Sequence, residues 1–320
     1  FAAAEDVLVA AHAEAVAAVR DQMDSPAALI GYHGQTLVHR PAERFTLQIG
    51  AAEILAGKTG LPVVHDFRSA DVAAGGQGAP LAPFYHHALA RGISAADSDI
   101  GSIVFLNIGG VANVTWVDPT IAAPEAPGAL LAFDTGPGNA QLNDWVQTRT
   151  GAPFDTDGAL AAAGTVDRAA LAVMTERAFL RQPPPKSLDR ADFDPPEEFS
   201  SLSVEDGAAT LAALTVATIA AAGRWFPRRA ARWYVMGGGR LNATMMEGLR
   251  KALDVPVKPI EQAPHAALSN RAPLDGDMVE AQCFAYLAAR AVAGLSLSAP
   301  GTTGVDTPCT GGCLAMPPLA

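Results

Sequence analysis

Short β-prone apolar runs alternate along this chain with longer stretches in which apolar residues recur at helical spacing. Leu8, Ala11, Ala15 and Val19 keep one apolar face at that spacing, and the pattern breaks at Pro26. A helix is therefore predicted over about residues 2–23. The same criteria predict strands at residues 28–32, 45–49 and 61–65 and a helix at residues 51–57. This alternation of strands and helices is typical of an α/β lobe.

A second series of elements starts after residue 98. Two β-prone runs, residues 103–107 and 112–117, flank a glycine turn and predict a β-hairpin. The remaining predictions are a buried strand at 130–135, helices in the 140s, 160s and 170s, a Pro-rich segment at 182–196, a long helix at 207–226 capped by Asp206, a strand at 233–236, a helix at 278–293 and a Gly/Thr/Pro tail. The pattern thus predicts two α/β lobes, residues 1–97 and 98–299, with the tail of about residues 300–320 packing back on the first.

Composition narrows the class of protein. The chain has 320 residues, and its 49% hydrophobic content is enough to bury the cores of two domains. A formal net charge of −11 gives no footprint for nucleic acid or an anionic membrane, so neither is an expected partner. The three cysteines, Cys283, Cys309 and Cys313, are odd in number and not spaced as paired ligands, which favours a reducing, cytoplasmic setting and makes zinc improbable.

The most apolar stretch of the chain covers residues 208–223. Threonines interrupt it and Arg224 closes it, so the sequence predicts a segment too short to span a bilayer. We expect this segment to be a buried helix instead.

Three glycine-rich turns follow predicted strands, at residues 107–113, 134–139 and 236–242. Glycine lets the backbone approach a phosphate closely, and a turn that leads into a helix points free N–H groups at an anion. A single turn of this kind is usually structural, but three of them with polar neighbours favour a nucleotide site. The third turn lacks the glycine spacing of a dinucleotide-binding fingerprint.

Several polar residues are candidates for chemistry, each with a structural alternative. Asp134 ends a buried strand, where a carboxylate is either catalytic or caps a turn. Arg68 either binds a carboxylate or phosphate or forms a structural ion pair. His33 has a hydrogen-bonded structural alternative, Glu280 that of an exposed helix acid, and Lys186 is expected to be solvated unless its loop closes over a ligand.

Taken together, these segments resemble the anhydro-N-acetylmuramic acid kinase family nearly from end to end. The matching motifs are HGQT at 33–36, TLQIG at 46–50, DFRSAD at 66–71, GGQGAPL at 75–81, LNIGGVAN at 106–113, FDTGPGN at 133–139, DG at 157–158, PKS at 185–187, GGG at 237–239 with Asn242, and EA at 280–281. The segment around Asp134 is the most specific of them. The resemblance implies a two-lobed, actin-like (ribonuclease H-like) α/β fold, with mixed sheets flanked by helices and a cleft between the lobes that binds ATP and Mg²⁺.

The reaction implied by this resemblance opens the 1,6-anhydro ring of 1,6-anhydro-N-acetylmuramic acid with water and phosphorylates O6, giving N-acetylmuramic acid 6-phosphate in peptidoglycan recycling. Asp134 would be the general base for the water. The implied substrate contacts are His33, Gln35, Thr36, Arg68 (to the lactyl carboxylate) and Glu280. The implied nucleotide contacts are Gly109, Gly110, Asn113, Gly136, Gly138, Asn139, Gly237, Gly238, Gly239 and Asn242. A homodimer is also implied.

The chain departs from the family pattern at two places. The family opens with a strand and a Gly-Thr-Ser-x-Asp-Gly phosphate-binding loop, which is not found before Phe1, so we expect a first lobe incomplete at its start and a fragment of a longer gene product. Asn143 stands where the family usually has aspartate, and the adjacent Asp144 is expected to point elsewhere on its helix.

Two other functions remain open on the sequence. One is a truncated or degenerate protein of this fold that binds sugar or nucleotide without turnover. The other is a kinase of the same fold that phosphorylates a different, open-ring amino sugar. The retained Asp134 argues against the first alternative, and the route of water into the product would distinguish the second.

Overall fold

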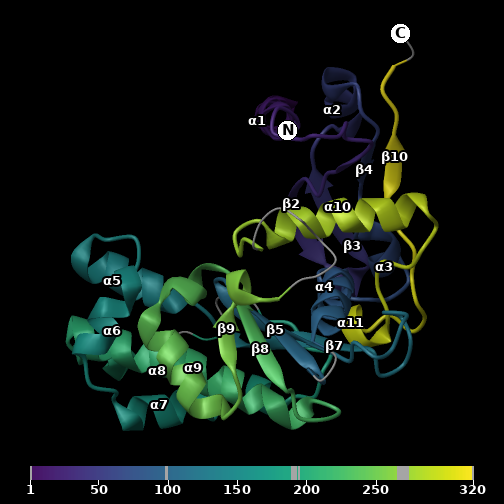
Figure 1. The fold of residues 1–320 in the computed structure, drawn as a ribbon. Coiled ribbons are helices and arrows are strands. Elements are labelled where there is room, and N and C mark those ends of the chain that lie inside the picture. Colours follow the sequence, from purple (N-terminus) through teal and green to yellow (C-terminus); the bar gives the residue numbers. More distant parts are fainter. Residues whose placement is uncertain (1, 98–99, 189–192, 194, 265–273, 319–320) are drawn as a thin grey trace. The chain divides into compact units, whose positions relative to one another are not determined.

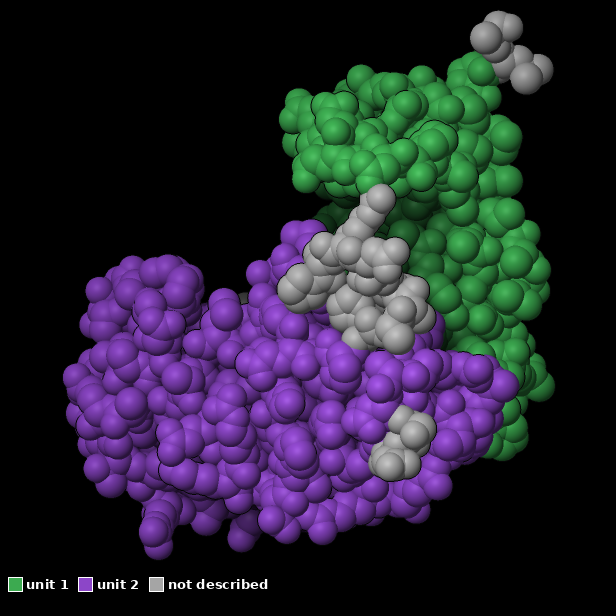
Figure 2. Space-filling view, in the orientation of Figure 1, with its two compact units in different colours: residues 1–85, 123–127, 280–320 green, residues 86–122, 128–279 purple. Residues whose placement is uncertain are grey.

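The computed structural model describes residues 2–97, 100–188, 193, 195–264 and 274–318. These residues form two compact units, shown in Figure 2. Unit 1 comprises residues 1–85, 123–127 and 280–320, and unit 2 comprises residues 86–122 and 128–279. The lobe boundary predicted near residue 98 falls on residues 98–99, outside the described residues, and the predicted lobes and the cleft between them stay predictions.

Unit 2 is built on a five-stranded mixed sheet. Its strands are β5 (Ile103–Ile108), β6 (Val111–Val117), β7 (Leu130–Pro137), β8 (Arg232–Met236) and β9 (Val257–Pro259), in the order β7-β6-β5-β8-β9. β6 runs antiparallel to both of its neighbours, whereas β8 and β9 are parallel to β5. One antiparallel strand in this order is the arrangement of a ribonuclease H-like lobe. The predicted actin-like fold class, with mixed sheets flanked by helices, is confirmed.

Both faces of this sheet are buried because alternate residues of its strands are apolar on each side. Val104 and Leu106 of β5 lie in one hydrophobic cluster with Leu211 of α8 (Val204–Ala221). Phe105, between them on the strand, stacks against His86 of α4 (Pro83–Ala96), with ring centroids 5.0 Å apart. Helix α8 therefore covers one face and α4, from His86 on, the other.

Helix α8 is the centre of the helical layer of unit 2 and has α5, α6, α7 and α9 around it (Figure 1). The bounds of these helices are α5 (Ala140–Thr150), α6 (Ala159–Ala163), α7 (Arg168–Thr175) and α9 (Ala243–Leu253). Short 3₁₀ turns complete the unit: η2 (Thr156–Gly158), η3 (Ala178–Arg181), η5 (Glu197–Ser201), η6 (Ala222–Trp225), η7 (Gly238–Leu241) and η8 (Ile260–Gln262).

Unit 1 contains a three-stranded sheet and a separate two-stranded hairpin. The sheet has the order β1 (Ile30–Gly31), β4 (Val63–His65) and β10 (Cys313–Ala315), and the hairpin pairs β2 (Gln35–Arg40) with β3 (Phe45–Ile49). The helices of the unit are α1 (Ala2–Arg20), η1 (Pro41–Glu43), α2 (Ala52–Thr59), α3 (Ser69–Ala73), α10 (Val279–Val292) and α11 (Pro300–Thr303). β10, which comes from the predicted tail of residues 300–320, pairs antiparallel with β4 and so adds a strand to this unit.

Two apolar contacts assemble the helices of unit 1. Val9 of α1 and Leu55 of α2 share a buried cluster with Val63 of β4. On α10, the Phe284 ring packs against the rings of His33 and Phe67, with centroids 4.6 and 5.2 Å apart. The residues after β1 and after β4 are thereby fixed against one helix.

The structure corrects several details of the sequence prediction. Helix α8 begins earlier than predicted and its N-cap is Ser203, whose Oγ accepts from the N–H of Asp206; Asp206 lies in the first turn and is not the cap. Strand β7 continues through Gly136, where a turn was predicted. Strands β2, β9 and β10 were not predicted, and parts of the Pro-rich segment, residues 189–192 and 194, lie outside the described residues.

The apolar segment in α8 is longer than the sequence suggested. Together with η6 it runs over Val204–Trp225, 22 residues that contain an 18-residue window with a mean hydropathy of 1.4, so the prediction that it is too short to span a membrane was wrong. However, 61% of that window is buried inside the structure, and the helix packs on β7 as a core helix. The prediction of a buried helix is confirmed.

Asp71 connects α3 to the last part of unit 1. Its carboxylate is 2% exposed and accepts from the Gly78 N–H (2.6 Å), the Thr303 hydroxyl (2.6 Å) and the Ser298 hydroxyl. We expect Asp71→Asn to lower the free energy of unfolding by about 2–3 kcal/mol, because the amide turns one buried acceptor into a donor that faces other donors.

Urea denaturation at neutral pH measures this change. Glu43→Gln is the control, since Glu43 forms only an exposed pair with Arg40 and should change stability by less than about 0.5 kcal/mol. Equal stability of the Asp71→Asn and Glu43→Gln variants would show that the Asp71 hydrogen bonds do not stabilise the fold.

Candidate functional site

Asp134, the predicted base, lies on β7, an edge strand of the sheet in unit 2. Residues 186–188, distant in the sequence, bind to this edge strand at Asp134. The Asp134 N–H donates to the carbonyl of Lys186 (3.1 Å), and the Leu188 N–H donates to Asp134 Oδ2 (2.8 Å). One carboxylate oxygen is thus held in place, and for Oδ1 the described residues provide no hydrogen bond.

The surroundings of Asp134 make its carboxyl group a weaker acid. Burial raises its pKa to about 6, and the Leu188 hydrogen bond and the charge of Lys186 only partly oppose this rise. A carboxylate with a pKa near neutrality can take a proton effectively from water or a hydroxyl group. The catalytic alternative for Asp134 is favoured over a turn cap, because its side chain binds a backbone group 54 residues away and none in its own turn.

The first two glycine turns are bound to each other. The Asn139 N–H donates to the Gly109 carbonyl (2.7 Å), and the Gly138 N–H donates to the Gly110 carbonyl (3.0 Å). The Asn139 side-chain amide also donates to the carbonyl of Ile108 (3.0 Å). A Cβ atom on Gly138 would overlap the Gly109 carbonyl, so only glycine allows the two turns to approach this closely.

The third glycine turn lies against the first. Gly237 has φ +74°, and a Cβ atom there would lie 2.5 Å from Asn107 Oδ1. The turn continues into η7 and α9, and Asn242 Oδ1 caps α9 by accepting from the Met245 N–H (3.0 Å). All three predicted turns therefore meet at one end of the sheet, where β5, β7 and β8 finish.

A buried arginine holds the third turn from its other side. Arg240, whose side chain is 6% exposed, donates to the Gly237 carbonyl (3.1 Å), to Glu261 (2.7 Å) and to Asp277 (2.8 Å). The hydrogen bond to Asp277 is the largest of the effects that raise the pKa of Arg240. This arginine was not singled out from the sequence, because its two carboxylate partners lie 21 and 37 residues further along the chain.

A pocket of about 240 Å³ opens beside these turns in unit 2. It is lined by Asn139, Leu142, Asn143, Phe154, Asp155, Thr156, Asp157, Gly238, Leu241 and Asn242. Three predicted nucleotide contacts, Asn139, Gly238 and Asn242, are thus brought together, whereas the other predicted glycines and Asn113 are not among the lining residues.

Sequence reasoning missed the three apolar residues of this pocket, Leu142, Phe154 and Leu241. Phe154 and Leu241 are 53% and 62% exposed, which is unusual for such large apolar side chains. The Asp157-Gly158 motif nearby was the one available signal. Asn143 also lines the pocket, whereas Asp144 is exposed and does not, so the prediction that Asp144 points elsewhere is confirmed.

Lys186 is not solvated as predicted. Its half-buried ammonium group donates to the Phe179 carbonyl (3.0 Å) and lies over the Phe179 and Phe133 rings, 4.5 and 5.8 Å from their centroids. Burial, and then the charge of Arg224, lower its pKa to about 8. The apolar rings cover this side chain, so the Pro-rich segment is anchored at Lys186.

In unit 1, Arg68 and His33 form a pair. Arg68 Nε donates to His33 Nε2 (2.8 Å), and Arg68 Nη1 donates to the Gly78 carbonyl (2.6 Å). Burial, and then the charge of Arg68, lower the pKa of His33 to about 4. His33 is therefore neutral at pH 7, and since Nε2 accepts from Arg68, the proton is on Nδ1, which donates to the Gly34 carbonyl (2.8 Å).

Two of the other predicted substrate contacts, Gln35 and Thr36, follow His33 in the sequence, and the third, Glu280, interacts with Arg68 through its charge. Gln35 is exposed at the start of β2, and the Thr36 hydroxyl accepts from Gln48 Nε2 (3.2 Å). Glu280 is exposed in the first turn of α10, and its negative charge opposes the lowering of the Arg68 pKa by burial. Glu280 is thus close enough to Arg68 for their charges to interact.

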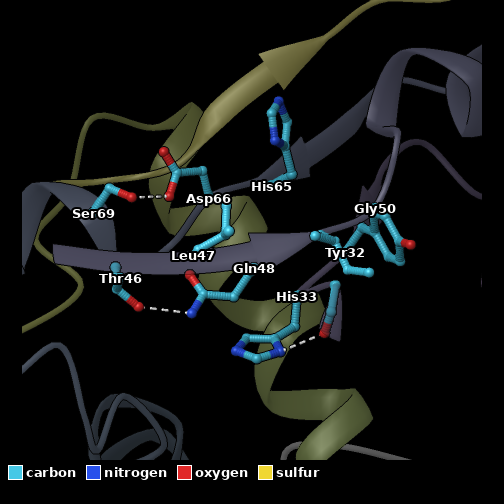
Figure 3. Close-up of a pocket in the computed structure, with 11 residues that line it drawn as sticks. Tyr32, His33, Thr46, Leu47, Gln48, Gly50, His65, Asp66 and Ser69 are labelled. Atoms are coloured by element: carbon cyan, nitrogen blue, oxygen red, sulfur yellow. Dashed lines mark hydrogen bonds between the residues drawn. The ribbon is translucent and has the colours of Figure 1, made fainter. Parts of the chain in front are cut away.

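A second pocket, of about 280 Å³, lies beside the hairpin of unit 1 (Figure 3). It is lined by Tyr32, His33, Gly34, Thr46, Leu47, Gln48, Ile49, Gly50, His65, Asp66 and Ser69. Figure 3 shows Thr46 and Gln48 on the His33 side of β3, and Leu47 on the side of Asp66. Of the predicted substrate contacts, only His33 lines this pocket.

The described residues contain no group of three or more His, Cys, Asp or Glu that could hold a metal ion. Mg²⁺ usually needs only one or two carboxylates when substrate phosphates supply its other ligands. The residues around the glycine turns are therefore compatible with Mg²⁺ carried by a nucleotide, but none of them is assigned as its ligand.

Comparison with known proteins gives one family. Residues 1–317 match the family model described as anhydro-N-acetylmuramic acid kinase. The "Anhydro-N-acetylmuramic acid kinase" of Acidiphilium cryptum is 51% identical over 308 residues, which are 96% of this chain and 78% of that protein. The protein of the same name from Cereibacter sphaeroides is 51% identical over 317 residues, 99% of this chain and 81% of that protein.

Similarities to solved structures are weaker. A xylulose kinase from Rhodospirillum rubrum aligns with 86% of this chain and 51% of its own at 17% identity, with a TM-score of 0.39. The activator of 2-hydroxyisocaproyl-CoA dehydratase from Clostridium difficile with bound ADPNP aligns with 76% of this chain and 84% of its own at 14% identity, with a TM-score of 0.40.

We expect His33 to contribute to loss of stability in acid. Its folded-state pKa of about 4 lies below the ordinary 6.5, so between these values the unfolded chain binds more protons and stability falls as the pH is lowered from about 6.5 to 4. In the His33→Gln variant this part of the pH dependence should be smaller. Thermal melting temperatures recorded from pH 4 to 7 test the expectation, with His12→Gln, an exposed histidine of α1 whose ring meets the Tyr32 ring edge-on, as the control; identical pH dependence of wild type and His33→Gln would contradict it.

Proposed function

Because the chain belongs to the anhydro-N-acetylmuramic acid kinase family, we propose that it converts 1,6-anhydro-N-acetylmuramic acid, water and ATP into N-acetylmuramic acid 6-phosphate and ADP. The observation that supports this most directly is Asp134. Its carboxylate is fixed through Oδ2 and has a pKa raised to about 6. Such a group is suited to accept a proton in a reaction that needs a general base near neutral pH.

In the proposed reaction, Asp134 takes a proton from water while the water oxygen bonds to the anomeric carbon. The bond from that carbon to O6 breaks, and O6 forms a bond to the γ-phosphorus as the bond to ADP breaks. Fixing Oδ2 by the Leu188 N–H leaves Oδ1 to accept the proton. One carboxylate thus serves both ring opening and phosphoryl transfer.

The nucleotide is proposed to bind at the end of the sheet where the glycine turns of unit 2 meet. The phosphates would be faced by the backbone around Gly109, Gly110, Gly136 and Gly138 and by the side chains of Asn113 and Asn139. The nucleoside would be faced by the turn of Gly237, Gly238 and Gly239 and by Asn242. The neighbouring pocket of about 240 Å³, with Phe154 and Leu241 on its wall, is of a size to hold a nucleoside. Mg²⁺ is proposed to accompany the phosphates, where it neutralises the charge that develops during transfer.

The sugar is proposed to bind through residues of unit 1. Arg68 has two of its N–H groups engaged by His33 and Gly78 and keeps others for the lactyl carboxylate. Gln35, Thr36 and Glu280 are the proposed contacts of the remaining polar groups. His33, whose ring nitrogens are both engaged, would act mainly by orienting Arg68.

The degenerate, non-catalytic alternative is not favoured, since relatives with this activity in their names are about half identical over nearly the whole chain. We further propose a cytoplasmic homodimer that recycles peptidoglycan sugars and binds neither nucleic acid nor membrane. The net charge of −11 supports the absence of polyanionic partners.

Asp134→Asn should lower kcat by about 10² to 10⁴, because the amide cannot accept the proton. ATP-dependent turnover of 1,6-anhydro-N-acetylmuramic acid in ¹⁸O-labelled water measures both rate and route, and wild type should place the label at the anomeric carbon. Phosphorylation of an open-ring amino sugar offered in its place, without label in the product, would instead indicate a kinase for another amino sugar. The assay is run on this chain and on a version that carries the family's opening Gly-Thr-Ser-x-Asp-Gly segment, with Asp254→Asn, an exposed side chain on α9's C-cap, as the control.

Leu241→Asp should raise the KM for ATP about tenfold and leave the KM for the sugar unchanged. The substitution removes an apolar wall of the nucleoside pocket and places a charge near the phosphates, an effect of about 1.4 kcal/mol or more. Leu314→Asp is the matched control, an exposed leucine on β10 of unit 1. Unchanged nucleotide kinetics in Leu241→Asp would remove this pocket as the nucleoside site.

A further inference from the structure

The segment that holds Asp134 is itself held by two side chains, those of Lys186 and Leu188. Residues 186–188 contact Asp134 twice, through the Lys186 carbonyl and the Leu188 N–H. These residues follow Pro183, Pro184 and Pro185, and the side chains of Lys186 and Leu188 attach them to unit 2. Leu188 lies in the core cluster of unit 2, and Lys186 is the polar anchor.

The Lys186 side chain is held by a carbonyl and two aromatic rings. Its ammonium group donates to the Phe179 carbonyl at 3.0 Å and lies between the rings of Phe179 and Phe133, the residue that precedes Asp134. Arg224 of η6 binds the next carbonyl, that of Leu180, at 2.7 Å. The end of η3 thus binds two cations, of which Lys186 is the one whose charge acts on Asp134.

No other charge described near Asp134 opposes or replaces this one. On the neighbouring strand β6, the residue opposite Asp134 is the neutral Asn113. Helix α8, which packs on β7, presents the neutral Thr218 there, and Arg224 acts on Lys186. Lys186 is therefore the described cation that favours the ionised form of the carboxylate.

We propose that Lys186 is a positioning residue for the reaction: its ammonium group, bound to the Phe179 carbonyl, anchors the segment whose backbone orients Asp134, and its positive charge stabilises the negative charge of that carboxylate. The kinetic part of this proposal rests on the proposed function. In this role Lys186 acts through Asp134 and not as a ligand of either substrate.

Lys186→Met tests the role, because methionine keeps the apolar length of the side chain and removes the charge. Loss of the cation raises the Asp134 pKa, so the acidic limb of the kcat profile, expected near pH 6 in wild type, should move up by about one pH unit. On that limb kcat falls about tenfold, and the KM values for ATP and sugar stay within about twofold. Lys186→Arg should keep the limb in place, and Lys251→Met, which breaks only an exposed pair with Glu247, is the control.

A second measurement separates this proposal from the proposed function. The carboxyl carbon of Asp134 is titrated by ¹³C NMR and assigned by its absence in Asp134→Asn. An upward shift of its midpoint in Lys186→Met supports the proposal even if wild type does not turn over the sugar. If Lys186→Met does not fold, Lys186→Gln, which keeps a donor for the Phe179 carbonyl, takes its place in both measurements.

Two results would overturn the proposal. In one, neither the kinetic limb nor the Asp134 midpoint moves when the charge is removed. In the other, the KM for ATP rises at least tenfold while the limb stays in place, which would make Lys186 a direct ligand of the nucleotide.

Discussion

The candidate nucleotide site depends on a close approach of backbone segments at one end of the sheet in unit 2, where three strands finish. Gly138 lies against the Gly109 carbonyl, and Gly237 lies against Asn107, at separations that no side chain permits. These contacts bind three turns to one another, so that backbone segments from distant parts of the chain lie close together there. Each turn alone is an ordinary connection; their hydrogen bonds to one another, such as Asn139 to Gly109, make them a single platform.

The properties of Asp134, the candidate general base, depend on its burial. An ionised carboxylate loses hydration free energy when it is buried, unless hydrogen bonds or nearby positive charges replace the lost water. At Asp134, burial outweighs one backbone hydrogen bond and the charge of Lys186, and the resulting pKa of about 6 lies close to neutrality. The edge position of β7 matters here, since an edge strand leaves backbone groups to which the Lys186–Leu188 segment can bind. Position in the sheet, more than local sequence, gives Asp134 its properties.

In unit 1, by contrast, the polar side-chain atoms of His33 and Asp71 are engaged in hydrogen bonds. His33 Nε2 accepts a hydrogen bond from Arg68 and is therefore not available as a base. Asp71 accepts three hydrogen bonds, from groups up to 232 residues away in the chain. Both residues belong to motifs that carry the resemblance to the family; His33 contacts Arg68, and Asp71 connects α3 to the last part of unit 1. The remaining N–H groups of Arg68 are what this part of the chain offers an anionic ligand.

The sequence by itself determined the fold class, most helices and strands, the family and the glycine turns, because hydrophobic period and turn chemistry are local properties that can be recognised over a few residues. It did not determine that Ser203 caps α8, that β10 completes a sheet with β4, or that Phe154 and Leu241 share a pocket with Asn242. Nor could it show that Lys186 is anchored beside Asp134, 52 residues away in the chain. Only the tertiary structure decided these points, since burial, hydrogen-bond partners and pKa arise from segments that are far apart in sequence and meet after folding.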